Sequence, residues 1–240
     1  MEHIQLNPIG RATSCYPEKF GTPRQSGLVS SAEAFIEIFK EYQPEISLSG
    51  LSSYSHMWLL FLFHLNKTER FHAKVHPPRL DGKTMGLFAT RTPHRPNPIG
   101  LSLVEIVKVE ESGVRVKGID LVDDTPILDI KPYLPQTESI PSAKSGWVEE
   151  LRNESTTVDW QETALQKLRT LVKDIKIDQY KALIENTVRL DPRPLVYKNE
   201  NFGESKYRDF HTLRIYELDI EFKFESRSLA QILDVRLALV

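Results

Sequence analysis

The chain has 240 residues, of which 40% are apolar and 27% are charged, as is usual for a globular protein with a substantial core. Its 31 basic and 33 acidic side chains give a net charge of −2, which excludes a strongly basic nucleic-acid binder of the histone kind. The single cysteine, Cys15, excludes an intramolecular disulfide and a zinc site built on several thiolates.

Two features of the sequence bear on where the protein works. The longest unbroken apolar run, Met57–Phe63, is far shorter than the roughly 20 residues that a membrane-spanning helix needs. The first five residues have neither the basic start nor the apolar stretch of a secretory signal. We therefore expect a cytoplasmic protein.

The first part of the chain, residues 1 to about 145, consists of short apolar segments broken by proline and glycine. This pattern indicates strands joined by turns, so we expect a mainly β domain, either an antiparallel β-barrel or a sandwich. A short helix is expected at Pro44–Leu51. Ile99–Val109 has apolar residues on both faces and predicts a strand buried on both sides. The predicted strands are Ile4–Ile9, Ala34–Phe39, His56–Phe63, Phe71–His76, Thr84–Thr90, Ile99–Val109, Val114–Lys117 and Ile127–Ile130.

From residue 146 to residue 240 the pattern changes, and we expect a smaller α+β domain. Apolar residues at helical spacing predict a helix over Thr163–Ile175, with Asp159 as its cap, and Asp178 is the expected cap of a second helix. Strict alternation of apolar and polar residues predicts a strand over Tyr216–Glu225, which pairs with Leu229–Leu239 as a hairpin.

The overall charge balance hides a local concentration of positive charge. The stretch Lys67–Arg95 holds seven basic residues, two acidic residues and three of the seven histidines. Such a cluster is either a solvated face or a landing surface for phosphate, and the cluster alone does not decide between them.

The strongest local signal in the sequence is Thr92–Pro98, in which three prolines exclude a helix and a central strand. This stiff loop presents Arg91, Arg95 and Asn97, and it is either a preorganised pocket wall or a stiff connector. The chain lacks a glycine-rich dinucleotide fingerprint, a GxxxxGK[ST] loop, a GxSxG elbow and an HExxH motif.

Two clusters invite a metal site, and both have simpler explanations. His72 and His76 would share a metal on a helix, but Pro77-Pro78 favours an extended chain, which sets them about 13 Å apart. Four aspartates could bind Mg²⁺, but aspartates commonly fill turns, where they bind their own backbone. We therefore expect no metal site. The four aspartates are Asp120, Asp123, Asp124 and Asp129.

The run Ala89–Ser102, followed by Asp120–Tyr133, resembles the TsaA-like family. The resemblance implies an S-adenosylmethionine-dependent methyltransferase that modifies N6 of threonylcarbamoyladenosine at tRNA position 37, next to the anticodon. It also implies a β-barrel that binds the methyl donor without a Rossmann fingerprint, usually as a homodimer. Further matches are Pro23-Arg24-Gln25, Ser55-His56-Met57-Trp58, His76-Pro77-Pro78-Arg79 and, as in longer bacterial members, Asp191-Pro192-Arg193-Pro194.

The family motif also implies which positions bind the methyl donor. At Asp124 the family usually has glycine, and aspartate tolerates a left-handed backbone better than most residues, so we expect the turn to survive. Carried over by motif, the positions are Pro23, Arg24, Gln25, His64, Leu65, Arg91, Leu101, Asp124, Thr125, Pro126 and Ile127.

Methyl transfer from a sulfonium is an in-line displacement, which requires alignment and the exclusion of water. Arg24 or Arg91 is the candidate for the carboxylate of the methyl donor, since arginine offers a bidentate fork. The side chains of Leu65, Leu101 and Ile127 are the candidates for its adenine.

The acceptor N6 is poorly nucleophilic, so removal of its proton should help the reaction. The candidates for this role are Asp129 and Tyr133, with His64 as a weaker one. Arg95 or Lys131 would bind the threonyl carboxylate of the acceptor, and Asn97 is a further candidate substrate-binding residue.

The positive stretch would then receive the anticodon arm, whose loop bases are accessible. The alternative reading is a non-catalytic RNA-binding or regulatory β-barrel that uses the Lys67–Arg95 surface alone. A metal-dependent hydrolase that uses the aspartates is a distant third.

Overall fold

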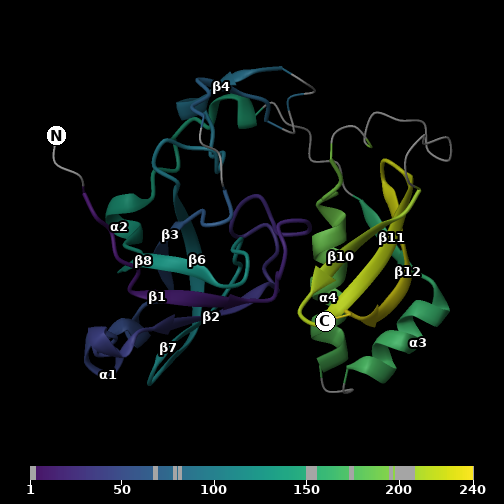
Figure 1. Ribbon diagram of the computed structural model, residues 1–240, viewed down its shortest axis with the longest axis horizontal. Coiled ribbons are helices and arrows are strands. Elements are labelled where there is room, and N and C mark those ends of the chain that lie inside the picture. Colours follow the sequence, from purple (N-terminus) through teal and green to yellow (C-terminus); the bar gives the residue numbers. More distant parts are fainter. Residues whose placement is uncertain are drawn as a thin grey trace.

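The computed structural model describes residues 4–66, 70–77, 80, 83–149, 156–172, 176–194, 197 and 209–239. It contains a closed barrel of six antiparallel strands, followed by a smaller four-stranded sheet with two helices (Figure 1). This confirms the expected fold class, a mainly β protein with an N-terminal antiparallel barrel and a C-terminal α+β part.

The barrel follows the strand order β1-β2-β7-β6-β3-β8. Inward and outward residues alternate along its strands, as the sequence pattern requires. In the strand over residues 56–62, Met57, Leu59 and Phe61 are buried inside, and the residues between them lie on the outer face. The six strands are β1 (Gly10–Ser14), β2 (Glu33–Ile38), β3 (His56–Leu62), β6 (Ile99–Glu110), β7 (Gly113–Lys117) and β8 (Thr125–Pro132).

The first strand does not lie where the sequence predicts it. Residues 4–9 form no strand, and β1 occupies Gly10–Ser14 between β2 and β8. Its inward residues are Gly10, Ala12 and Ser14, which are too small to give an apolar alternation. Gly10 is required here, because a Cβ at this position would overlap the backbone carbonyl of Glu37 in β2.

The prediction that the sixth strand is buried on both faces is also wrong. Gly100, Ser102 and Val104 of β6 are buried, whereas Leu101 is 53% exposed and Val107 is 47% exposed. Because the barrel is closed on itself, each strand has one interior face and one outer face. The outer face of β6 is therefore exposed although it carries apolar residues.

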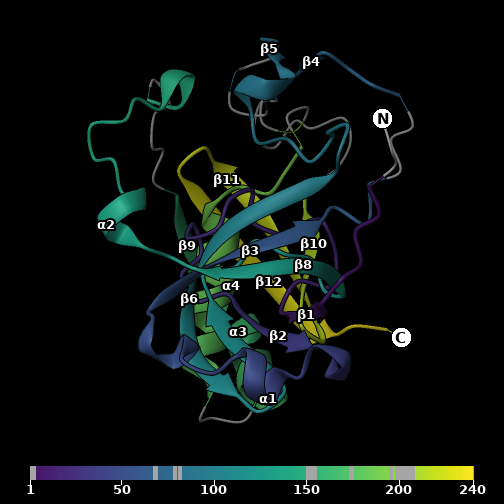
Figure 2. The same ribbon diagram turned by 90° about the vertical axis from the view of Figure 1, so that its left-hand side faces the viewer.

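The segment between β3 and β6 contains little regular structure. The predicted strands Phe71–His76 and Thr84–Thr90 shrink to a two-residue pair, β4 (Lys74–Val75) and β5 (Met85–Gly86). Figure 2 shows this pair above the end of the barrel. Trp147 of the later linker donates its ring N–H to the carbonyl of Ala89, 2.9 Å away, and so braces the segment.

Two short helices lie on connections of the barrel. The predicted helix over Pro44–Leu51 is one turn, α1 (Pro44–Ser47), and α2 (Pro135–Glu138) follows the last barrel strand.

The C-terminal part has the strand order β10-β11-β12-β9. The predicted hairpin is confirmed as β11 (Leu218–Ser226) and β12 (Leu229–Leu237). Two further strands, β10 (His211–Ile215) and β9 (Thr157–Trp160), were not predicted from the sequence pattern, and β9 runs parallel to β12.

Both C-terminal helices are present, but their expected caps are wrong. Helix α3 (Glu162–Leu171) is capped by Gln161, because Asp159 belongs to β9, and it ends before residues 173–175, which lie outside the described part. Helix α4 (Ile177–Arg189) begins after Lys176, and Asp178 lies in its first turn, where a negative charge is favourable.

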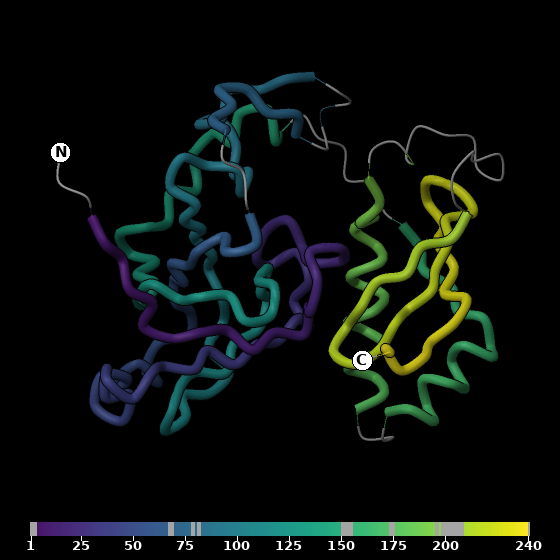
Figure 3. The backbone as a smooth tube through the Cα atoms, in the orientation of Figure 1, coloured from purple at the N-terminus to yellow at the C-terminus, as the bar shows by residue number. Residues whose placement is uncertain are grey.

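Helix α4 lies between the barrel and the C-terminal sheet (Figures 1 and 3). A buried hydrogen bond of 3.1 Å joins the Tyr16 hydroxyl, which follows β1, to the Thr187 hydroxyl of α4. The backbone N–H of Tyr216 donates to the carbonyl of Cys15 at 2.9 Å. One continuous apolar core runs through both parts. Within the described residues, no helix has the length and apolar character to cross a membrane.

Candidate functional site

Three connections leave the barrel at the same end, because β1, β3 and β7 all run toward it. They are residues 15–32, 63–98 and 118–124. Backbone bonds join them: the N–H of Gly27 donates to the carbonyl of Gly118 (2.8 Å). Lys19 Nζ donates to the carbonyl of Leu65 at 2.7 Å. Most of the positions that the family motif assigns to the methyl donor therefore lie around one rim.

The proline-rich segment forms a stiff part of this rim. Residues 92–98 form neither helix nor strand, as predicted. The Arg95 guanidinium donates to the carbonyl of Thr90 at 3.0 Å and lies 5.8 Å from the centre of the Phe88 ring. Phe88 is 77% exposed, so this cation–aromatic pair presents a flat apolar face to solvent. Asn97 is exposed beside it.

The sequence pattern indicates Asp120 only as one of four possible Mg²⁺ ligands, whereas the structure places it at the rim beside β6. Its carboxylate accepts a 2.6 Å hydrogen bond from the Ser102 hydroxyl of β6. Burial raises the pKa of this carboxyl to about 6, against the opposing effects of the Ser102 hydroxyl, the Ser26 backbone N–H and the charge of Arg91. One signal in the sequence indicates this role: Asp120 is a carboxylate between the apolar residues Ile119 and Leu121, in a segment that contains several site candidates.

The turn at Asp124 survives the replacement of glycine, as expected. Asp124 has φ = 58°, in the left-handed region, and its backbone N–H donates to the carbonyl of Ala12 at 2.9 Å. Ile127 is fully buried inside the barrel, so its side chain does not reach a ligand at the rim, contrary to expectation. Only the backbone of this position is available to a ligand.

The two candidates for proton removal are not brought together. Asp129 is opposite Leu60 of β3, which is opposite Leu101 of β6, so Asp129 and Leu101 share one row of the outer wall. Two strand spacings separate them, about 10 Å. Tyr133 lies four residues beyond Asp129, about 13 Å along an extended chain.

Both candidates already have partners. Lys131 Nζ lies 2.7 Å from the Asp129 carboxylate, so Lys131 and Asp129 form an ion pair on the outer wall. The Tyr133 ring packs edge-on against Trp58 and His56, with ring centres 5.9 and 6.4 Å apart.

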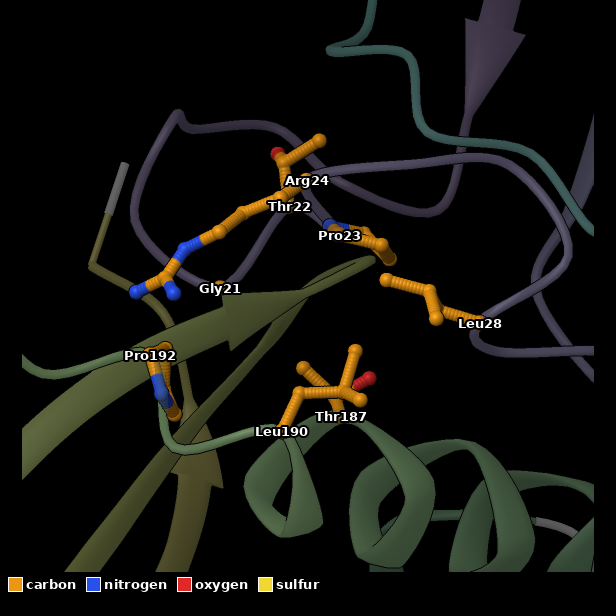
Figure 4. Close-up of a pocket in the computed structure, with 8 residues that line it drawn as sticks. All are labelled: Gly21, Thr22, Pro23, Arg24, Leu28, Thr187, Leu190 and Pro192. Carbon is orange, nitrogen blue, oxygen red and sulfur yellow. The ribbon is translucent and has the colours of Figure 1, made fainter. Parts of the chain in front are cut away.

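A pocket lies where the first rim loop meets the C-terminal part (Figure 4). Pro23, Arg24 and Leu28 form one side, and Thr187 and Leu190 at the end of α4 form the other. Pro192 of the Asp191-Pro192-Arg193-Pro194 motif also lines it. The C-terminal motif therefore lies against the loop that carries Pro23-Arg24-Gln25.

Comparison with known proteins identifies the family. The model of the tRNA-methyltransferase O N-terminal domain matches residues 11–139, and the model of the TrmO C-terminal domain matches residues 153–238. This chain belongs to the tRNA-methyltransferase O family. The TsaA-like resemblance stated from the motifs is thereby confirmed.

Relatives in the family match along nearly the whole chain. A protein of Pseudomonas aeruginosa described as putative S-adenosylmethionine-dependent methyltransferase RcsF is 37% identical, over 96% of each chain. The Escherichia coli (strain K12) tRNA (adenine(37)-N6)-methyltransferase is 39% identical, over 85% of this chain and 88% of its own. The crystal structure of TrmO from P. aeruginosa superposes with a TM-score of 0.80 at 32% identity and covers 99% of each chain.

The rim has the chemistry that the methyl donor of this family requires. Arg91 is exposed and offers a cation for a carboxylate, and the exposed side chains of Leu65 (41%) and Leu101 (53%) offer apolar surface. Next to Leu65, the Nδ2 atom of Asn66 is buried and has no hydrogen-bond partner among the described residues. A buried unpaired N–H is costly, and an acceptor atom of a ligand would satisfy it. The residues therefore fit the methyl donor.

The aspartates and histidines that were weighed as metal ligands lie apart in the structure. In the described part of the chain, no three side chains of His, Cys, Asp or Glu gather as metal ligands. Asp123 accepts the backbone N–H of Ser14 at 2.8 Å, Asp124 lies 3.8 Å from Arg11, and Asp120 and Asp129 have the partners given above. Each aspartate thus has its own local partner. His72 and His76 lie exposed in a segment without a helix.

Proposed function

We propose that this chain transfers the methyl group of S-adenosylmethionine to N6 of threonylcarbamoyladenosine at tRNA position 37. The observation that carries the proposal is family membership in both parts of the chain, with the N-terminal model matching residues 11–139. The exposed rim of cationic and apolar residues around Asp120 supports it independently of the comparisons.

The methyl donor would bind at the rim, held by Arg91 or Arg24 at its carboxylate and by Leu65 and Leu101 at its apolar parts. S-adenosylmethionine supplies an activated methyl group on a sulfonium when bound. The backbone of residues 124–127 and the amide of Asn66 would complete its hydrogen bonds. Pro23, Gln25 and His64 would form the remaining wall, since Pro23 and His64 are little exposed. The stiffness of residues 92–98 keeps the wall in place without loss of entropy on binding.

The acceptor would approach along the outer wall that carries Leu101 and Asp129. Asp129 is the better placed of the two bases, because it shares a row with Leu101, whereas Tyr133 lies further along the strand. Lys131 holds the Asp129 carboxylate at 2.7 Å and would exchange this partner for the threonyl carboxylate of the acceptor. Asp129 would then be released to take the proton from N6. Arg95 and Asn97 would bind the acceptor from the rim.

The anticodon arm would lie on the segment from Arg70 to Arg95. The described residues of this segment include five lysines and arginines and no acidic residue. Phe71 is 60% exposed and Phe88 is 77% exposed. Cations for phosphates combined with exposed aromatic rings for unstacked bases are typical of single-stranded RNA recognition.

Three further expectations belong to the same proposal, and they concern the domain boundary, the oligomeric state and the cellular location. We place the division between the barrel and the C-terminal part near residue 145, in the linker between β8 and β9, so that the parts are 1–145 and 146–240. The apolar outer wall around Leu101 and Leu103 would pair with a second copy of this chain as a homodimer. The acceptor would then approach between the two chains, and the partner would contribute to the acceptor side of the site. We also expect the enzyme to work in the cytoplasm.

The deciding experiment is to incubate hypomodified tRNA with the purified protein and S-adenosylmethionine, digest the tRNA and analyse the nucleosides by mass spectrometry. A gain of one methyl group on threonylcarbamoyladenosine is the expected result. If no nucleoside gains a methyl group, and RNA binding is salt-sensitive but indifferent to the methyl donor, the non-catalytic RNA-binding barrel is the correct reading.

The dimer has its own test. Leu103→Glu places a charge on the outer wall, and sedimentation should then show a monomer. The monomer should have lost most methyl transfer, and full activity of the monomer would show that one chain makes a complete site.

A further inference from the structure

Asp120 accepts a 2.6 Å hydrogen bond from Ser102, its carboxyl pKa is clearly raised, and the motif assigns it no role. It lies in the connection between β7 and β8, two residues after Gly118, where φ = 77° turns the chain under the first rim loop. The neighbouring backbone is firmly held: the carbonyl of Gly118 accepts the N–H of Gly27, and its N–H donates to the carbonyl of Ala32, both at 2.8 Å.

Groups from three segments of the rim favour the charged form of the Asp120 carboxylate. The Ser102 hydroxyl of β6 donates at 2.6 Å, and Ser102 itself is 1% exposed. The Ser26 backbone N–H of the first loop and the positive charge of Arg91 in the proline-rich segment also favour the charged form of this carboxylate, each less strongly than the Ser102 hydroxyl does.

Each partner is itself a proposed methyl-donor residue or is adjacent to one. Ser26 directly follows Pro23-Arg24-Gln25, Ser102 directly follows Leu101, and Arg91 is the candidate for the carboxylate of the methyl donor. The carboxylate is thus hydrogen-bonded to β6 and influenced by two other segments. Ser26 lies 65 residues before Arg91, and Arg91 lies 11 residues before Ser102.

We propose that Asp120 is a positioning residue, whose charged carboxylate fixes the Ser26 loop, β6 and the Arg91 guanidinium in the arrangement that binds the methyl donor. This inference rests on the proposed function and adds to it a residue that acts through others. Asp120 orients Arg91 by its charge and the other two segments by hydrogen bonds.

The free-energy cost of desolvating the Asp120 carboxylate indicates that the arrangement serves binding rather than folding. A buried carboxylate is desolvated, so folding disfavours its charged form. Because its folded pKa lies above the ordinary value of 3.8, its contribution to stability is fully present below about pH 4 and is lost as the pH rises through 6. At neutral pH a neutral side chain of equal shape would serve stability better, so the charge is retained at a stability cost.

The test is Asp120→Asn, which keeps the shape and the acceptor for Ser102 but removes the charge that faces Arg91. Calorimetry at pH 7.5 should show S-adenosylmethionine binding weakened at least tenfold, whereas the KM for tRNA changes less than twofold. The thermal midpoint of Asp120→Asn at the same pH should be equal to or higher than that of the wild type. A purely structural residue would give the opposite result in stability.

A pH profile separates the charge from the shape. Wild-type affinity for S-adenosylmethionine should fall as the pH is lowered from 7 to 5, and Asp120→Asn should lack this component. Histidines also titrate in this range, but they are present in both proteins, so the difference isolates position 120.

Two further variants test whether the effect of Asp120→Asn on affinity comes from a general disturbance of the loop. Ser102→Ala removes only the hydroxyl and should weaken binding about threefold, in the same direction. Asp123→Asn makes the same chemical change three residues away, where the carboxylate accepts a backbone N–H that an amide oxygen also accepts. It should leave affinity unchanged within twofold.

The outcomes distinguish this inference from the proposed function. If the wild type binds S-adenosylmethionine and Asp120→Asn binds it equally well, the positioning role is wrong and the proposed function stands. If the wild type does not bind S-adenosylmethionine, both are wrong.

Discussion

Asp120 and Asp124 lie four residues apart in one connection and have different physical roles. Asp120 carries its carboxylate at a partly buried position, whereas Asp124 is exposed and supplies a left-handed backbone at φ = 58°. The Asp124 backbone N–H binds Ala12, and its carboxylate reaches only a long contact of 3.8 Å with Arg11, so the turn depends on its backbone. A weak exposed ion pair contributes little to stability.

The first prediction concerns this turn. Asp124→Gly should change the free energy of unfolding by less than about 1 kcal/mol, because relief of strain offsets the greater freedom of the unfolded chain. Asp124→Val should cost about 1–3 kcal/mol, since a β-branched residue disfavours positive φ. Urea denaturation of both variants measures the difference. Equal stability of the valine variant and the wild type would show that the turn does not require a left-handed residue.

The second prediction concerns Arg91. Arg91→Ala should weaken S-adenosylmethionine binding at least tenfold, because the proposed carboxylate contact is lost. Calorimetry provides the measurement, and Arg115→Ala is the matched control, since Arg115 is an exposed arginine of β7 that pairs with Glu110. Unchanged affinity of Arg91→Ala would remove the role proposed for Arg91.

At the scale of elements, β6 connects the core of the barrel with the proposed site. Its inward residue Gly100 leaves room for the Phe61 ring of β3, and a Cβ there would overlap that ring. Its outward residue Leu101 follows immediately and lies on the apolar outer wall. The period of two therefore places a packing residue and a proposed binding residue next to each other.

A third prediction follows for β6. Gly100→Ala should destabilise the protein by about 1–3 kcal/mol through overpacking against Phe61. Urea denaturation should show that combining it with Phe61→Leu recovers part of this loss, as expected for two residues in contact. Gly86→Ala is the control: a Cβ there meets open space, so it should change stability by less than about 0.5 kcal/mol. If both glycine variants have the same stability, Gly100 does not make room for the ring.

At the scale of the whole molecule, the barrel and the C-terminal part share one core. Cys15 and Tyr16, at the end of β1, lie at their junction and are fully buried. The Tyr16 hydroxyl binds Thr187 of α4 at 3.1 Å, and Asn186 of the same helix donates to the Ser31 hydroxyl at 3.3 Å. Because the core is continuous, we expect the two parts to unfold in one transition.

The fourth prediction tests the junction. Tyr16→Phe leaves the buried Thr187 hydroxyl without its partner and should cost about 1–2 kcal/mol. Tyr54→Phe, at an exposed tyrosine, is the control and should cost less than about 0.5 kcal/mol. Urea denaturation followed by fluorescence and by circular dichroism should give coincident curves. Two separate transitions would show that the parts are independent.

The fifth prediction uses the cysteine at the same junction. Burial raises the pKa of the Cys15 thiol to about 12, so at pH 8 it is both inaccessible and almost entirely protonated. A thiol reagent should label native protein only at the rate of unfolding, and labelling should become rapid in denaturant. Rapid labelling of the native protein would show that the junction opens without unfolding.

The motifs predicted the family, and the strand pattern predicted much of the fold. Strict alternation located β11 and β12, and three prolines correctly excluded regular structure from residues 92–98. The small inward residues Gly10, Ala12 and Ser14 gave no apolar signal, so the position of β1 was wrong. The roles carried over by motif stay predictions.

The sequence alone determined the family, the mainly β class and the residue types available for a methyl donor, because these depend on local composition and short motifs. Only the tertiary structure showed that the barrel closes, that Ile127 turns inward while Leu101 turns outward, and that Asp120 accepts a hydrogen bond from Ser102 of a different strand. Which face a side chain occupies depends on the partners of its strand, and the pKa of a carboxyl depends on groups that lie far away in the sequence. Neither quantity is encoded in any short segment of the chain.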